Sequence, residues 1–118
     1  WIEPSSGTRW LRHVAVLTNR GCFSATNTFV SDIKLLPQVK VFGDTTGGGG
    51  GLPMSAELPC GWSVRYSSSP MLDIDKKHIE FGVAPDVEVG ITDADFQRGT
   101  DTIIEEAKKW LDTFRIRL

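Results

Sequence analysis

Apolar residues in the first third of the chain follow two different periods. Residues 13–18 form a short run rich in apolar and β-branched side chains between polar residues, which predicts a buried strand. From Ser24 to Leu36 the apolar residues fall at 29, 30, 33 and 36, one face of a helix that Pro37 ends. Residues 39–42 predict a second strand. A strand, a helix and a strand in this order favour a right-handed parallel crossover.

The middle of the chain predicts a β-hairpin. Residues 54–58 and 62–66 flank the turn sequence Pro59-Cys60-Gly61. Apolar Trp62, Val64 and Tyr66 alternate with polar residues. We therefore expect one face of the hairpin to be buried and the other to be in contact with water.

The last third combines weak strand signals with the clearest helix. Residues 77–80 predict a short strand, and Val87 and Val89 predict a strand edge. One continuous apolar stripe then predicts a helix: Ile103, Ile104, Ala107, Trp110, Leu111 and Phe114. We expect this helix to begin with a capping box from Thr102 to Glu105, or with Asp101 as its cap. Glu105 and Lys109 have the spacing of a favourable ion pair.

Length, charge and cysteine content limit the classes of function. The 118 residues suffice for a single domain, and the sequence shows no internal repeat. A net charge of -2 without long runs of one sign argues against a dedicated nucleic-acid binder, and no apolar stretch reaches membrane-spanning length. Cys22 and Cys60 lack the spacing of a zinc site, so we expect no metal. Two buried free thiols are expected, with a disulfide as the alternative.

Five consecutive glycines, Gly47 to Gly51, follow the second predicted strand. A flexible linker is the ordinary interpretation of such a run. The alternative is a loop whose backbone approaches another segment closely, because the run is short and follows a strand directly. It is not a phosphate-binding loop, since no Gly-Lys-Ser/Thr sequence follows.

Ser24 stands between the first predicted strand and the first predicted helix. A serine before a helix is most often an N-cap, whose oxygen accepts a hydrogen bond from a backbone N–H group. On a strand-to-helix turn, the same hydroxyl can instead attack a carbonyl and leave the oxyanion facing backbone N–H groups. The local pattern alone favours the N-cap.

Three short segments occur in a fixed order along the chain. They are Cys22-Phe23-Ser24-Ala25-Thr26, Val41-Phe42-Gly43-Asp44-Thr45-Thr46-Gly47-Gly48 and Glu80-Phe81-Gly82-Val83-Ala84-Pro85-Asp86. Together they resemble the catalytic core of the C-terminal processing, or tail-specific, serine proteases, a family that includes the tricorn protease core and the interphotoreceptor retinoid-binding proteins. The likeness extends from about Val14 to Leu111. It implies an α/β fold of the crotonase-like (ClpP-like) type, a mixed sheet with flanking helices.

The resemblance also implies roles for individual residues. Ser24 would be the nucleophile, and the backbone N–H of Ala25 would be one donor of the oxyanion hole. Glu80 matches the glutamate that supports the base in the tricorn-like branch. The substrate, a polypeptide, would bind along the glycine loop at Gly47, Gly48 and Gly49. No metal or cofactor is implied.

Departures from the family pattern concern the general base. The bacterial tail-specific branch has a lysine 25 residues after the serine, where this chain has Gly49, and this excludes a Ser–Lys pair of that kind. The tricorn-like branch takes a histidine from the amino-terminal part of its core, which nothing here matches. His13 and His78 are weaker candidates, and His78 would share a strand face with Glu80. Three positions after the serine the family has an acidic residue, and this chain has Asn27.

We therefore expect residues 1–118 to be a single domain, the carboxy-terminal half of a tricorn-like core cut from something longer. It would belong to a serine peptidase that acts through an acyl-enzyme on Ser24, and the isolated chain would be inactive without the base histidine. Unpaired sheet edges and apolar surface would favour self-association. Bacterial members are commonly extracytoplasmic, which implies the periplasm or cell envelope. The alternatives are a domain that binds apolar ligands or proteins, and a non-catalytic assembly module.

Overall fold

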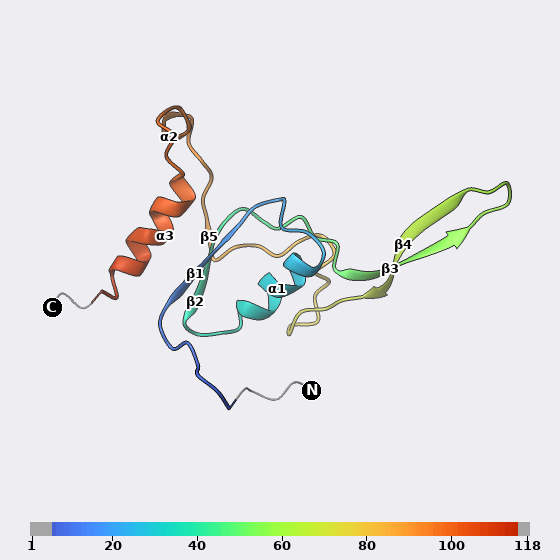
Figure 1. The fold of residues 1–118 in the computed structure, drawn as a ribbon, viewed down its shortest axis with the longest axis horizontal. Coiled ribbons are helices and arrows are strands. Elements are labelled where there is room, and N and C mark those ends of the chain that lie inside the picture. The colour runs from blue at the N-terminus through green and yellow to red at the C-terminus, as the bar shows by residue number, and fades with distance from the viewer. Residues whose placement is uncertain (1–5, 116–118) are drawn as a thin grey trace.

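A three-stranded parallel sheet lies at the centre of the computed structural model, which describes residues 6–115 (Figure 1). The strands β1 (Val14–Thr18), β2 (Val39–Gly43) and β5 (Val87–Glu88) pair in the order β1-β2-β5. Helix α1 (Ala25–Ile33) connects β1 to β2. The predicted strand, helix and strand with parallel pairing are confirmed, as is a mixed α/β fold.

The predicted hairpin is formed by β3 (Gly51–Glu57) and β4 (Ser63–Pro70), which project from the body of the molecule (Figure 1). The expectation of one buried face is wrong, because all eight residues of β4 are exposed. The alternation itself is present, since Met54 lies opposite Tyr66 and Ala56 opposite Val64. These side chains make one apolar face that the described residues leave uncovered.

Two helices follow β5. The short helix α2 (Asp93–Gln97) is absent from the sequence prediction, because it has no apolar stripe. The longer helix α3 (Thr102–Asp112) packs on β1 and β2, with Ala107 buried. Asp101, the second of the two predicted caps, accepts hydrogen bonds from the N–H groups of Ile103 and Ile104 at 2.9 and 3.2 Å.

The predicted ion pair between Glu105 and Lys109 is wrong in its partners. Glu105 pairs with Lys108 at 2.8 Å, and Glu106 pairs with Lys109 at 2.6 Å. Both pairs join residues three apart, which are also neighbours on a helix surface. In each pair the lysine lies about one turn after the glutamate that it contacts.

The predicted strand at residues 77–80 does not form. A turn interrupts it, in which the N–H of Lys76 donates to the carbonyl of Asp73 at 3.0 Å and the N–H of Lys77 donates to the Asp73 carboxylate at 2.8 Å. Only an isolated bridge between Leu72 and His78 remains. His78 and Glu80 therefore do not share a strand face.

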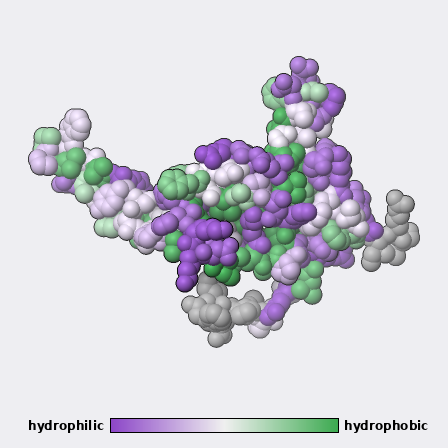
Figure 2. Space-filling view, turned by 180° about the vertical axis from the view of Figure 1, so that it is seen from behind, coloured by the Kyte–Doolittle hydropathy of each residue, from purple (hydrophilic) through white to green (hydrophobic). Residues whose placement is uncertain are grey.

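The buried apolar core is small for a chain of this length. It consists of Val30, Val41, Phe42, Ile79 and Ala107. On the predicted apolar stripe of α1, Phe29 and Leu36 are 54% and 45% exposed. Figure 2 shows apolar side chains spread over the surface of one face. The radius of gyration is 18.3 Å, whereas a compact domain of this length has about 13–14 Å.

Candidate active site

Ser24 occupies the turn between the end of β1 and the start of α1. Its φ of 59° and ψ of −120° are unusual for a residue other than glycine, and such a conformation costs about 1–3 kcal/mol. Its N–H donates to the carbonyl of Gly48 at 2.8 Å, and its own carbonyl accepts from the N–H of Thr28 at 3.1 Å. The backbone around the residue is thus held from both sides.

The side-chain hydroxyl of Ser24 is not used as a cap. Ser24 stands at the N-cap position, but its oxygen makes no capping hydrogen bond with the described residues. The capping role that the local pattern favours is wrong, because a capping residue normally has extended backbone angles and Ser24 does not. The residue is exposed, so the hydroxyl is accessible from solvent.

Ala25 is the first residue of α1. The first N–H groups of any helix have no acceptor within the helix and carry a partial positive charge. The Ala25 N–H is therefore one of the donors that a developing oxyanion beside Ser24 would meet. Its role in an oxyanion hole stays a prediction.

The glycine run passes between the Ser24 turn and the Glu80 segment. The N–H of Gly47 donates to the carbonyl of Cys22 at 2.8 Å, and the N–H of Gly49 donates to the carbonyl of Glu80 at 2.9 Å. A Cβ added to Gly48 would lie 2.1 Å from the Glu80 carbonyl oxygen. The run is therefore a loop of close backbone approach, and the flexible-linker interpretation is wrong.

A buried group of hydrogen bonds fixes the same three segments. Asn27 and Thr46 are fully buried, and the Thr46 hydroxyl donates to the Asn27 side-chain oxygen at 2.5 Å. The Asn27 amide donates to the carbonyl of Ile79 at 2.9 Å, and the N–H of Val83 donates to the Thr46 hydroxyl at 2.7 Å. We call Asn27, Thr46, Ile79 and Val83 the buried frame. It joins α1, the loop after β2 and the chain on both sides of Glu80.

Ser24 and Glu80 line one pocket of about 420 Å³. Its other lining residues are Phe23, Gly49, Gly51, Pro53, Arg65, Tyr66 and Ser67. Of the predicted site residues, the structure thus brings together Ser24, Gly49 and Glu80. Gly47, Gly48 and Ala25 do not line this pocket. Gly47 and Gly48 form backbone hydrogen bonds with Cys22 and Ser24, and Ala25 begins α1.

The hairpin adds residues to this pocket that the sequence did not single out. The hydroxyl of Ser67 donates to a carboxylate oxygen of Glu80 at 3.3 Å. Arg65 and Tyr66 line the pocket beside it. Only the polar alternation of β4 hinted at them, and the sequence does not say that this strand lies against Glu80.

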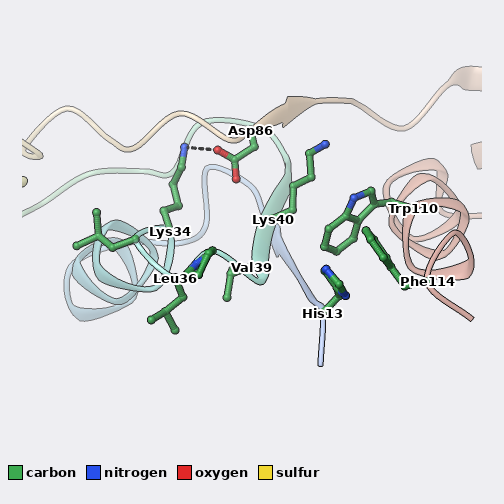
Figure 3. A pocket seen from close by; sticks show the side chains of 10 residues that line it. His13, Lys34, Leu36, Val39, Lys40, Asp86, Trp110 and Phe114 are labelled. Atoms are coloured by element: carbon green, nitrogen blue, oxygen red, sulfur yellow. Dashed lines mark ion pairs between the residues drawn. The ribbon is translucent and has the colours of Figure 1, made fainter. Parts of the chain in front are cut away.

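The two histidines lie elsewhere. Figure 3 shows His13 in a different pocket of about 510 Å³, stacked on Phe114 at 3.5 Å between ring centroids and edge-on to Trp110 at 5.7 Å. This pocket lies where β1 and β2 begin, whereas Ser24 follows the far end of β1, about 16 Å along the strand. His78 is exposed and lines a third pocket with Asp73 and Ile79. Neither histidine lines the pocket of Ser24.

Neither cysteine lines the pocket of Ser24. Cys22 and Cys60 are free thiols, but the expected burial of both is wrong, because Cys60 is exposed at the hairpin turn. Within residues 6–115, no group of three or more His, Cys, Asp or Glu side chains could hold a metal ion. None of the helices in that range is long and apolar enough to cross a membrane.

Comparison with known proteins identifies the family of the chain. The model of Peptidase family S41 matches residues 3–89, and no curated protein matches the chain. The crystal structure of a candidate peptidase from Parabacteroides merdae ATCC 43184 is 60% identical, with a TM-score of 0.90 over 93% of this chain and 35% of that one. Mature CPAF in complex with lactacystin is 21% identical, with a TM-score of 0.71 over 95% of this chain and 21% of that one.

The tricorn protease is similar at the level of fold. It is 23% identical, with a TM-score of 0.71 over 88% of this chain and 11% of that one. The chain thus spans about a third of the Parabacteroides structure and less of the other two. The resemblance to C-terminal processing proteases that the sequence predicts is confirmed. On the family model and on 60% identity across nearly its whole length, the chain belongs to Peptidase family S41.

Proposed function

We propose that Ser24 is the nucleophile of a serine peptidase that hydrolyses peptide bonds through an acyl-enzyme. One observation carries the proposal. Ser24 is exposed, has backbone angles rare for serine, keeps its hydroxyl free of the helix, and shares a pocket with Glu80. Unusual backbone angles at a site of this kind are a recurrent property of catalytic turns.

The chemistry follows from the positions of these groups. The Ser24 oxygen would attack the carbonyl carbon of the scissile bond while its proton passes to a base. The Ala25 N–H would donate to the oxyanion, and loss of one such donor typically lowers the rate by about 10²–10³. The base then gives the proton to the leaving amine, and water hydrolyses the acyl-enzyme. The backbone at Gly47, Gly48 and Gly49 would lie along the bound polypeptide.

The general base in this proposal is a histidine that residues 1–118 do not supply. His13 is stacked on Phe114, and His78 lines another pocket. Glu80 would orient that histidine, as the third member of a triad does. The isolated chain would then be inactive, because loss of a triad member typically removes about 10⁴–10⁶ of the rate.

We infer further that the chain is the carboxy-terminal part of a larger crotonase-like (ClpP-like) core of the tricorn-like branch. Its accessible surface of 9305 Å² exceeds by about 3,000 Å² that of a compact protein of its size. The rest of a core, or a second copy of the isolated chain, would cover this excess surface. An extracytoplasmic location, in the periplasm or cell envelope of a bacterium, is proposed from the family alone.

A second candidate is a non-catalytic domain that binds apolar ligands or proteins on the same fold. The pocket supports this candidate because the apolar residues Phe23 and Pro53 line it. Phe23 is 59% exposed, so its ring is free to contact a ligand. Such a domain would need neither a free hydroxyl nor a carboxylate beside it.

Labelling with a fluorophosphonate separates the two candidates. Applied to the full-length protein, the probe should modify Ser24, as mapped by mass spectrometry of tryptic peptides. Ser24→Ala should abolish the label, whereas Ser55→Ala, a serine of β3 that does not line the pocket, should keep it. Absence of label together with tight binding of an apolar ligand would support the binding domain instead.

A further inference from the structure

One face of β4 is directed toward the pocket of Ser24. Arg65 and Ser67 are two residues apart on this strand, so their side chains leave the same face of the hairpin. The hydrogen bond from the Ser67 hydroxyl to Glu80, at 3.3 Å, identifies that face as the one beside the proposed catalytic groups. Arg65 lines the same pocket as Ser24. A guanidinium group is therefore available in the pocket of the proposed nucleophile.

The guanidinium of Arg65 has no partner among the described residues. Three other arginines are engaged: Arg98 pairs with Asp95, Arg115 pairs with Asp112 at 3.3 Å, and Arg20 donates to the carbonyl of Thr46 at 3.3 Å. Arg12 also has no partner among the described residues, but it does not line the pocket of Ser24. An arginine presents its donors in a planar fork that matches a carboxylate. A free arginine in a substrate pocket is thus suited to bind an anionic group of the substrate.

The remaining lining of the pocket favours this role. Glu80 is the other charged residue there, and it already accepts a hydrogen bond from Ser67 and forms no ion pair with Arg65 within 4.0 Å. Phe23 lines the same pocket, and an aromatic ring packs well against the aliphatic part of a side chain and against a guanidinium plane. The substrate is then the natural source of the missing carboxylate.

We infer that Arg65 determines specificity by binding a carboxylate of the substrate, either on an Asp or Glu side chain or at the free end of the peptide. This inference depends on the proposed peptidase function. Two residues along a strand span about 6.7 Å, and an extended peptide bound beside the hairpin has the same rise. The selected carboxylate would therefore lie within about three residues of the scissile bond.

The test uses the full-length protein and quenched fluorescent peptides. Matched pairs carry Glu or Gln at each of the three positions on either side of the scissile bond, and each pair is made with a free and with an amidated carboxyl end. We expect kcat/KM to be about tenfold higher for a Glu peptide than for its Gln partner, or for the free than for the amidated end. The pair that shows the difference identifies the source of the carboxylate.

Variants then assign the preference to the side chain. Arg65→Gln should bring the ratio of kcat/KM between the acidic peptide and its neutral partner from about tenfold down to about one. Arg65→Lys should keep part of the preference, because a lysine keeps the charge but not the fork. The control Lys108→Gln removes a positive charge from the exposed face of α3 and should keep the full preference.

The outcomes distinguish failure of the peptidase function from failure of the role of Arg65. A wild-type protein that is neither labelled at Ser24 nor active on any peptide overturns the proposed function, and the inference with it. A protein that is labelled and cleaves acidic and neutral peptides equally well leaves the peptidase intact and overturns the role of Arg65. The wild-type ratio decides this even if Arg65→Gln does not fold. A preference that Arg65→Gln retains also overturns it.

Discussion

The body around Ser24 and the β3–β4 hairpin are built in opposite ways. The body buries few of its large apolar side chains, but short backbone contacts and the buried frame join its segments. The hairpin has large apolar side chains on one face, and none of the described residues covers them. The comparison teaches that hydrogen bonds within the chain hold the serine turn in place, whereas no described residue covers the apolar face of the hairpin.

The largest expected change in the stability of the body comes from adding a methyl group to the glycine loop. Gly48→Ala would place a Cβ 2.1 Å from the Glu80 carbonyl oxygen at a φ of 83°. We expect a loss of about 3 kcal/mol or more in the free energy of unfolding, from steric overlap and from the left-handed backbone. Chemical denaturation of the full-length variant measures it.

The matched control for the loop is Gly90→Ala. No atom lies within 4 Å of a Cβ added at Gly90, and its φ is not in the left-handed region. We expect this substitution to change the free energy of unfolding by less than about 0.5 kcal/mol. Equal effects of the two substitutions would contradict the close-approach interpretation of the glycine run.

The second prediction concerns the buried frame. Asn27→Ala removes the partner of the Thr46 hydroxyl and of the Ile79 carbonyl. Leaving such buried groups unsatisfied costs about 1–3 kcal/mol each, so we expect a loss of about 2–4 kcal/mol in unfolding experiments. Asn19→Ala, which removes one exposed hydrogen bond to the N–H of Gly21, should cost less than about 1 kcal/mol.

The third prediction addresses the uncovered face of the hairpin. Val64→Ser should change the stability of the isolated 118-residue chain by less than about 0.5 kcal/mol, because Val64 is exposed there. In the full-length protein the same change should cost about 1–2 kcal/mol if a further segment covers this face. Parallel urea titrations of the two forms measure the difference, and equal small values would show that the face stays open.

The isolated chain should also associate with itself through such surfaces. Light scattering at increasing concentration should show species larger than a monomer, and Trp62→Ser should reduce them, since Trp62 is 71% exposed beside the hairpin turn. A clean monomer at high concentration would contradict this expectation.

The smallest expected effect lies at the corner between α2 and α3. Hydrogen bonds from Thr102 first, and then from Thr92 and Arg98, lower the pKa of Asp95 from its ordinary value of 3.8. A lowered carboxyl pKa stabilises the fold above 3.8 and loses that contribution as the pH falls through the folded pKa. Asp95→Asn should therefore flatten the acid limb of the stability curve slightly, as followed by circular dichroism, and Asp93→Asn should not.

Most helices and strands were predicted because the residues that signal each one lie within the element itself. The runs at β1, β2 and α3 and the turn at residues 59–61 each contain their own period or turn sequence. The strand predicted at residues 77–80 does not form, because the carboxylate and carbonyl of Asp73 accept hydrogen bonds from the next residues and stabilise a turn. Helix α2 was missed because a Thr92 cap and the bonds of Asp95, rather than an apolar stripe, hold it.

The site was predictable in part for a different reason. Ser24 and Glu80 were predicted through a family pattern, and the structure shows that both line one pocket. Arg65 and Ser67 enter the pocket because the hairpin folds back against Glu80, and no local signal encodes that contact. Likewise, the alternation of β4 correctly separated two faces, but it could not say whether anything covers the apolar one.

The buried frame contains no ionisable group. An amide, a hydroxyl and backbone atoms make all of its hydrogen bonds. The alignment of the serine turn with the Glu80 segment therefore requires no proton to be gained or lost. The frame itself would therefore add no titration to the pH dependence of the proposed activity.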